Sequence, residues 1–182
     1  MKPDLREVTS MLAWISAALL ILLVTAPCFA RDDIREHRSC KFCGMNRETF
    51  SYSRMFLRYT DTTTVGTCSL HCTAIELTVN MSLVPCDVMV GDYATRKLIE
   101  AASAHWVIGG DRPGVMTQRA KWAFADKADA QAFTRLHGGK IVTFNDALQA
   151  AYEDLYGEVK MTMERATMRK TKLGSICDPP DR

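Results

Sequence analysis

Cys-Lys-Phe-Cys-Gly-Met at residues 40–45 is the stretch that decides how this chain folds and what it can hold. It places two thiols and a thioether within reach of one point. A second segment, Cys-Ser-Leu-His-Cys at residues 68–72, adds two more thiols and an imidazole. Sulfur donors select soft or borderline metals, above all Cu(I), zinc and iron–sulfur clusters. The two segments therefore predict a metal-binding protein.

The composition is that of an ordinary globular protein and excludes some functions. The chain has 182 residues, 47% hydrophobic and 24% charged, with a formal net charge of +2. This charge is too small to indicate nucleic-acid binding, and no basic run interleaved with aromatic residues is present. The sequence has no nucleophile–base arrangement, P-loop or dinucleotide fingerprint. We therefore predict no catalytic residues and do not expect an enzyme.

The first thirty residues have the layout of a signal peptide. Residues 11–25 are almost continuously apolar, and small residues precede a cleavage point after Ala30. We expect export to the periplasm. An uncleaved membrane anchor is the alternative, because residues 11–30 can just span a bilayer. Lipidation of Cys28 is a third reading.

The order of the remaining elements predicts an α+β fold made of two small ββαβ-type halves. The metal-binding domain is expected over residues 38–156, and its halves cover about 38–92 and 104–156. In the first half, residues 50–59 and 63–67 alternate as a β-hairpin, residues 68–80 have helical spacing, and residues 84–90 form a strand.

The second half repeats this order. The predicted elements are strands at 105–109 and 120–125, a helix at 126–137 with Ala130, Phe133 and Leu136 inward, a strand at 140–144 and a last helix at 146–156. Residues 157–182 contain methionines among charged residues. They carry too little apolar surface to fold alone, so they are predicted to be a flexible tail.

The helical segment predicts how three of the donors lie. With Thr67 as N-cap, Cys68, His71 and Cys72 fall on one face of the first turn, since positions three and four apart are neighbours on a helix. A helix N-terminus also lowers the pKa of a thiol and favours the thiolate that binds metal.

The choice of metal stays open at this level. Two cysteine pairs can form the tetrahedral Cys₄ site of structural zinc. Met45, beside the first pair, and Met116, in a glycine-rich loop, favour copper, because thioethers suit Cu(I) and contribute little to zinc binding.

Two further readings of the cysteines need no metal. In an exported protein each pair can be a structural disulfide, although a Cys-x-x-Cys bridge closes a very short loop. Cys40 and Cys43 can also form the exchange pair of a thiol–disulfide oxidoreductase, which usually starts a helix after a strand. Cys86 is predicted to be a buried small hydrophobe, and Cys177 lies in the tail, alone or paired with Cys86.

The chain resembles a known family over residues 38 to 155. The first cysteine segment, followed by an aromatic hairpin, is similar to the start of NosL-type accessory proteins of nitrous-oxide reductase. His-Trp-Val-Ile-Gly-Gly-Asp-Arg-Pro-Gly-Val-Met at 105–116 resembles the family's strand and glycine–methionine loop. The stretches 128–133 and 137–144 resemble its closing helix and strand. The segment 68–72 departs from the family pattern, because many relatives have no such donors there.

The resemblance implies an exported, membrane-associated Cu(I) carrier that helps supply copper to nitrous-oxide reductase. It implies two ββαβ-type halves, also similar to part of organomercurial lyase, and it carries over Cys43 (or Cys40) and Met116 as copper ligands. The implied partner is a copper-receiving periplasmic enzyme or its membrane maturation complex.

Taken together, the residues and the resemblance predict a periplasmic Cu(I) chaperone, with a zinc-built interaction module as the alternative. The full set of predicted donors comprises the thiolates of Cys40, Cys43, Cys68 and Cys72, with Met45, Met116 and His71 as secondary ligands.

Overall fold

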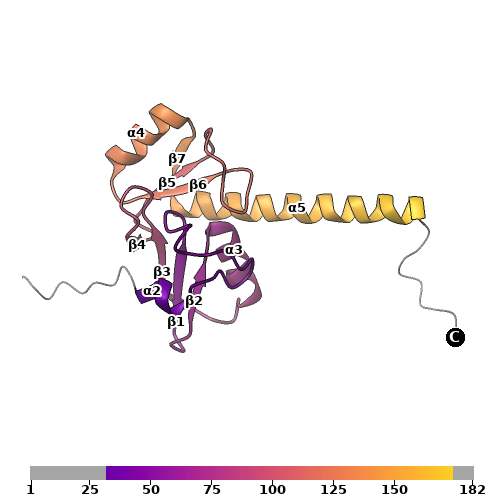
Figure 1. The fold of residues 1–182 in the computed structure, drawn as a ribbon, viewed down its shortest axis with the longest axis horizontal. Coiled ribbons are helices and arrows are strands. Elements are labelled where there is room, and N and C mark those ends of the chain that lie inside the picture. Colours follow the sequence, from indigo (N-terminus) through magenta and orange to yellow (C-terminus); the bar gives the residue numbers. More distant parts are fainter. Residues whose placement is uncertain (1–31, 174–182) are drawn as a thin grey trace, which may run out of the picture. The chain divides into compact units, whose positions relative to one another are not determined.

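The structure, a computed structural model, describes residues 32–173 (Figure 1). Those from Asp33 onward belong to one compact unit. The predicted signal peptide, the anchor and lipidation alternatives, and Cys177 lie outside the described residues. Among the described residues, no helix combines the length and apolar character that crossing a bilayer requires.

The first half of the fold is a four-stranded antiparallel sheet with a ten-residue helix, α3, and the short helix α2. β1 lies between β2 and β3, and β4 follows β3 at the edge. Three residues of β1 are buried in alternation with less buried ones, as expected of a central strand. The elements are α2 (Asp32–Glu36), β1 (Met55–Tyr59), β2 (Thr64–Thr67), α3 (Leu70–Val79), β3 (Pro85–Gly91) and β4 (Leu98–Glu100).

The second half follows the same path with three strands. β5 lies between β6 and β7, so each half puts its first strand in the centre of its sheet. The predicted α+β class is confirmed, while the likeness to organomercurial lyase stays a prediction. The elements are β5 (His105–Ile108), β6 (Lys121–Phe124), α4 (Lys127–His137), β7 (Lys140–Val142) and α5 (Phe144–Leu173).

The two sheets are joined where β3 ends. Asp92 forms a parallel bridge with Ala123 of β6, and the N–H of Tyr93 donates to the Ala123 carbonyl at 2.8 Å. The buried Asp92 carboxylate accepts the N–H of Ala125 at 2.9 Å and two hydrogen bonds from Thr95. These bonds fix the end of one sheet against the edge of the other.

Two apolar clusters draw on both halves. One contains Leu70 and Ala74 of α3, Trp106 of β5, and Ala147 and Ala151 of α5. The other is built around three cysteines and is lined by the second half, as described below. Both cores therefore depend on the chain from both halves.

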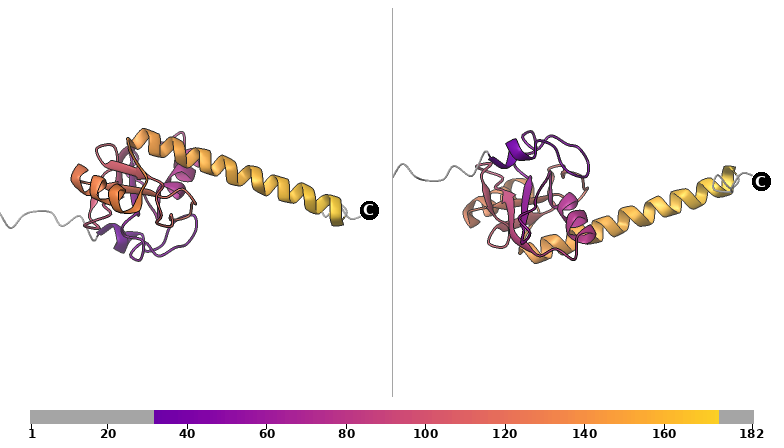
Figure 2. Two further views of the ribbon diagram at one scale, coloured as in Figure 1. Left: turned by 90° about the horizontal axis from the view of Figure 1, so that it is seen from above. Right: turned by 90° about the horizontal axis from the view of Figure 1, so that it is seen from below.

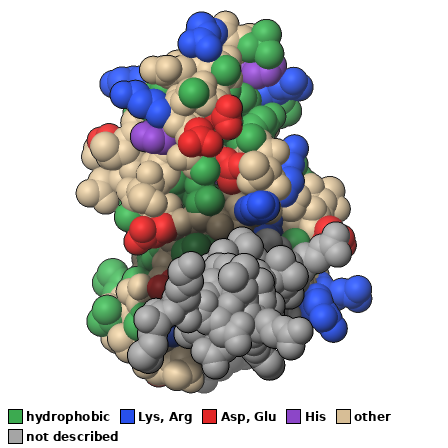
Figure 3. Space-filling model, turned by 90° about the vertical axis from the view of Figure 1, so that its left-hand side faces the viewer, with side chains coloured by type: hydrophobic (Ala, Val, Ile, Leu, Met, Phe, Trp, Pro, Cys, Tyr) green, Lys and Arg blue, Asp and Glu red, His purple; other side chains and the backbone are tan. Residues whose placement is uncertain are grey.

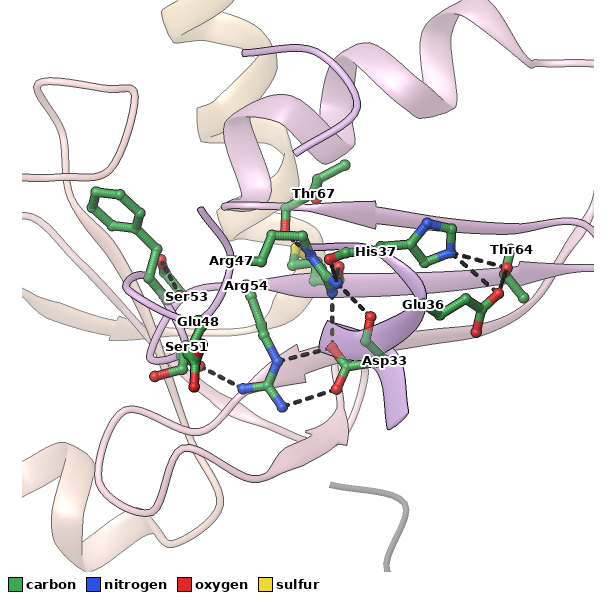
Figure 4. A network of polar contacts seen from close by, with 12 residues as sticks. Asp33, Glu36, His37, Arg47, Glu48, Ser51, Ser53, Arg54, Thr64 and Thr67 are labelled. Atoms are coloured by element: carbon green, nitrogen blue, oxygen red, sulfur yellow. Dashed lines mark hydrogen bonds and ion pairs between the residues drawn. The ribbon is translucent and has the colours of Figure 1, made fainter. Parts of the chain in front are cut away.

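A buried ion-pair network holds the segment that precedes β1 (Figure 4). The Asp33 carboxylate accepts hydrogen bonds from Arg47 at 2.8 Å and from Arg54 at 2.9 and 3.1 Å. Arg47 also donates to the carbonyls of His37, Met55 and Thr67, so its guanidinium links α2 to both strands of the hairpin. All three charged side chains are almost fully buried.

Several element boundaries differ from the prediction. The strand predicted over residues 50–59 begins only at Met55, because residues 47–53 form turns. The Asn46 side chain accepts the backbone N–H groups of Glu48 and Thr49, and such local bonds compete with strand pairing.

The last helix is longer than predicted. α5 runs through Gly157 to Leu173, so the segment after 156, predicted to be a flexible tail, continues the helix as far as residue 173. Glu, Lys, Met, Arg and Ala are good helix formers, and a single glycine costs only about 1 kcal/mol. In both views of Figure 2 this end of α5 extends away from the sheets, and residues 161–169 are all exposed.

Two burial predictions are also wrong. Leu136 of α4 is 75% exposed, because the buried face through Ala130 and Phe133 continues to His137, whose ring packs on Phe133 with centroids 4.8 Å apart. Cys86 of β3 is exposed rather than buried.

Candidate metal centre

The first cysteine pair lies on a tight turn. The N–H of Gly44 donates to the Cys40 carbonyl at 3.0 Å, and the N–H of Cys40 donates to the Met45 carbonyl at 2.9 Å. Gly44 has φ of 74°, a conformation that favours glycine. The backbone N–H groups of Cys43 and Phe42 point at the Cys40 sulfur. The turn therefore brings Cys40 and Cys43 to the same side.

Lys41 fastens this turn to the rest of the first half. Its N–H donates to the Gly66 carbonyl of β2 at 3.1 Å, and its ammonium lies 2.8 Å from the Glu76 carboxylate of α3. Glu76 is fully buried and also accepts hydrogen bonds from Tyr59 and Asn80. Glu76 is not among the predicted site residues, although its position four residues after Cys72 places it on the buried face of the helix.

The second cysteine pair lies at the junction of β2 and α3. The helix begins at Leu70 with Ser69 as N-cap, so Cys68 precedes the helix and the prediction of Thr67 as N-cap is wrong. Cys72 lies within the first turn. The Cys68 carbonyl accepts a hydrogen bond from Ser53 at 2.8 Å, which ties the second pair to the loop that carries the first.

The four sulfur atoms lie together. All four Sγ atoms are within 4.8 Å of one another; Cys43 and Cys68 are 3.4 Å apart, and Cys68 and Cys72 are 3.8 Å apart. A disulfide has an S–S distance of about 2.05 Å, and the described cysteines are all free thiols. Four sulfurs around a tetrahedral metal at about 2.3 Å lie about 3.8 Å apart. The spacing is therefore close to that of a metal-binding thiol cluster.

Hydrogen bonds within the cluster favour one thiolate. The bond from Cys68, with a second from Cys72, holds the pKa of Cys40 well below the usual value of a thiol. Donating to Cys40 in turn raises the pKa of Cys68 and of Cys72, and burial adds to both increases. These shifts favour the thiolate form at Cys40 over the thiols of Cys68 and Cys72, and a thiolate is the form that binds metal.

Apolar side chains of the second half enclose the cluster. Three of the cysteines are buried, whereas Cys43 is partly exposed. Cys43 is therefore the accessible member of the four. The residues that pack around them include Val107, Val115, Ala120, Trp122, Phe124 and Phe133.

The structure places the three secondary candidates differently. Met45 is partly buried and packs against the same core as the cysteines. Met116 is 40% exposed and has φ of 60°, while its neighbour Val115 lies in the cysteine core. Among the described residues, the close group of metal-binding donors comprises only the four cysteines, so His71 is outside it.

His71 is nevertheless a buried imidazole beside this group. It is 4% exposed, its Nδ1 has no hydrogen-bond partner within the described chain, and its Nε2 lies 3.7 Å from Glu158 of α5. Burial lowers its pKa, so the imidazole is neutral, as a metal ligand must be.

The turn also bears on the redox reading of the first pair. In an exchange pair the cysteines are expected to begin a helix. Residues 41–43 form a turn here, and the more N-terminal thiol, Cys40, is the buried one. The arrangement offers little access for a disulfide substrate at Cys40.

Comparison with known proteins places this architecture. The profile of the NosL family matches residues 31–152. The crystal structure of the copper chaperone NosL from Shewanella denitrificans is similar with a TM-score of 0.51 and 24% identity, over 63% of this chain and 92% of that one. At this identity the likeness concerns the fold alone. No curated protein matches the chain. Because the family profile covers about two thirds of the sequence, the chain belongs to the NosL family.

Proposed function

We propose that this protein is a non-enzymatic Cu(I) chaperone that supplies copper for the maturation of nitrous-oxide reductase or a related copper enzyme. The observation that carries the proposal is the group of four Sγ atoms within 4.8 Å of one another, with one thiolate favoured at Cys40. Thiolates select soft or borderline metals, Cu(I) and zinc among them, and a group of four of them can hold either.

The surroundings of the group support copper in particular. Met45 packs against the cysteine core, and the exposed Met116 follows Val115 of that core. Thioethers bind Cu(I) well and zinc poorly. The structurally similar protein from Shewanella denitrificans is described as a copper chaperone. We therefore propose Met45, Met116 and the buried His71 as secondary ligands.

Delivery requires that a partner's ligands reach the metal. Cys43 is partly exposed, whereas the other three cysteines are buried. Exchange would begin at Cys43, since an incoming ligand can replace an exposed thiolate before a buried one. A site with one accessible ligand suits transfer better than a fully enclosed cage does.

The proposed location is the periplasm. The proposed partner is the copper-receiving enzyme or its membrane maturation complex, with membrane association through the N-terminal segment. Export rests on the signal-peptide layout of residues 1–30. On the face shown in Figure 3, Lys and Arg side chains are scattered among acidic and apolar ones. The formal net charge of +2 is too small to indicate a nucleic-acid partner.

The test is a Cu(I) titration of the reduced protein against a chromophoric Cu(I) chelator. We expect tight binding of about one Cu(I) per chain by a protein that is folded when empty. Binding should be lost in Cys43→Ser. Cys86→Ser is the matched control, because Cys86 is an exposed cysteine outside the group, and its variant should bind as the parent does.

A structural zinc site is the second candidate, and one observation favours it. The Sγ separations of 3.4 and 3.8 Å are near those of a tetrahedral Cys₄ site. Zinc content measured on the same sample separates the two. Stoichiometric zinc that resists Cu(I), with unfolding when a chelator removes it, would contradict the chaperone and leave a zinc-built interaction module.

A further inference from the structure

We propose that Asp154 of α5 is a positioning residue that holds the Met116 loop in place for metal binding. The inference rests on the proposed function, because it takes Met116 as a copper ligand. It extends that function to α5. This helix carries none of the predicted metal ligands, and the inference gives it a part in forming the site.

Asp154 receives donors from three residues that follow Met116. Its Oδ2 accepts the hydroxyl of Thr117 at 2.8 Å and the ammonium of Lys121 at 2.5 Å, and its Oδ1 accepts Arg119 Nε at 2.8 Å. Arg119 makes a further hydrogen bond to the Ala150 carbonyl of α5, also at 2.8 Å. One carboxylate therefore ties the end of the loop to the helix.

The other side of Met116 is fixed inside the molecule. Val115 is 6% exposed and packs in the cluster that contains Cys40, Cys68 and Cys72. Met116 thus lies between a residue anchored in the cysteine core and a residue bonded to α5. With both neighbours held, the direction of its backbone is fixed, while its side chain remains 40% exposed.

The backbone of Met116 indicates that these anchors act against its own preference. Its φ of 60° lies in the left-handed region, which residues with a Cβ rarely adopt. Such conformations persist where the surrounding structure fixes them, and they cluster at functional sites. The turn is tight as well, because a Cβ at Gly114 would lie 2.4 Å from the Thr117 carbonyl.

The same helix also reaches the second cysteine pair. Glu158, one turn after Asp154, lies 3.7 Å from Nε2 of His71, the residue before Cys72. α5 therefore contacts both the methionine loop and the helix that carries Cys72. Replacing residues that orient metal ligands typically lowers metal affinity by about 10- to 100-fold.

The decisive variant is Thr117→Val, which removes the bond nearest Met116 and keeps the side-chain shape. We expect its Cu(I) affinity to fall about tenfold or more, with one sulfur fewer around Cu(I) by X-ray absorption. Thr117→Ser should restore both. Glu153→Gln is the control, because Glu153 contacts Arg119 from the same helix without touching Thr117 or Lys121, and it should bind as the parent does.

The role of Asp154 itself is tested in the full-length protein with and without Met116. In the Met116→Ala background, Thr117→Val and Asp154→Asn should cause no further loss of affinity, since they act through Met116. An equal loss in both backgrounds would overturn the proposal in favour of a general structural effect. Asp154→Asn removes the charge partner of the buried Lys121 and can prevent folding. Thr117→Val leaves this ion pair intact, so it keeps the test valid in that case.

The result also separates this inference from the proposed function. Loss of Cu(I) binding in Cys43→Ser with no effect of Met116→Ala would overturn the positioning role and leave the thiolate site intact. Unchanged Cu(I) binding in Cys43→Ser would instead contradict the proposed function.

Discussion

Gly66 of β2 lies directly against the guanidinium of Arg47: a Cβ at Gly66 would be 2.6 Å from Arg47 Cζ and 2.5 Å from His37 Cβ. Real Cβ atoms do not approach other atoms so closely, so any larger residue must displace the arginine. We predict that Gly66→Ala lowers the free energy of unfolding by about 1–3 kcal/mol or more. Chemical denaturation monitored by circular dichroism measures the loss.

Gly157 offers the opposite case in the same chain. It lies in α5, and a Cβ there meets nothing within 4 Å. Gly157→Ala should therefore keep or raise stability, by up to about 1 kcal/mol, because alanine has the higher helix propensity. Equal losses in the two variants would show that steric contact at Gly66 is not the cause.

The buried network at Asp33 predicts a large effect from one charge. Asp33→Asn leaves Arg47 and Arg54 buried without their carboxylate, and removing one partner of a buried ion pair typically costs about 3–5 kcal/mol. Thermal denaturation should show this loss. The exposed pair of Arg58 with Asp87 is the comparison, where Asp87→Asn should cost about 1 kcal/mol or less. Similar costs in both would contradict the role given to burial.

Asp92 predicts a component of acid unfolding. Burial alone would raise its pKa, but hydrogen bonds from Thr95 and Ala125 hold it below the ordinary 3.8. A carboxylate with a lowered pKa in the folded state stabilises the protein above its unfolded pKa, and this contribution is lost as the pH falls below about 3.8. Equilibrium unfolding between neutral pH and pH about 2 should show this loss in the parent and not in Asp92→Asn.

Thr95→Ala is the partial version of the same test. It removes the hydroxyl donor at 2.6 Å while the carboxylate remains. The pKa of Asp92 should then rise toward its usual value, so the contribution of the carboxylate should be smaller and be lost at higher pH. An acid transition unchanged in both variants would rule out Asp92 as its source.

The thiol cluster predicts a thiolate in the metal-free protein. Because hydrogen bonds from Cys68 and Cys72 lower the pKa of Cys40 well below that of an ordinary thiol, the reduced protein should show about one thiolate per chain at neutral pH. Its ultraviolet absorbance measures the thiolate directly. The signal should be absent in Cys40→Ser and present in Cys86→Ser, and its persistence in Cys40→Ser would place the charge on another cysteine.

The parts of the fold that sequence predicts well are those set by local spacing. Each strand–strand–helix–strand order follows from alternation and helical periodicity, and the spacings Cys40–Cys43 and Cys68–Cys72 bring each pair together by local geometry alone. The close approach of the two cysteine pairs is less certain from sequence, because it depends on how the hairpin between them folds back.

What the sequence does not predict depends on distant partners or on competing local bonds. From sequence, Asp33 is expected to be exposed, and only the hydrogen bonds from Arg47 and Arg54 explain its burial. Glu76 is likewise buried with its charge paired by Lys41, which lies far away in the sequence, so its burial cannot be predicted from its neighbours. The helix is predicted to end at 156 because the apolar periodicity ends where α5 leaves the core. The residues that follow are still good helix formers, so the helix continues to Leu173.

The two halves share one strand order, β2-β1-β3 and β6-β5-β7, yet all four clustered cysteines belong to the first. The second half supplies Val107, Trp122 and Phe124 as the wall of the same cluster. The first copy of the architectural plan thus bears all four clustered thiols, whereas the second encloses them and supplies the proposed ligand Met116. Mutational tolerance should be divided accordingly: the first half is constrained by the identity of its donors, and the second, apart from Met116 and the residues that hold its loop, by the volume and shape it must fill.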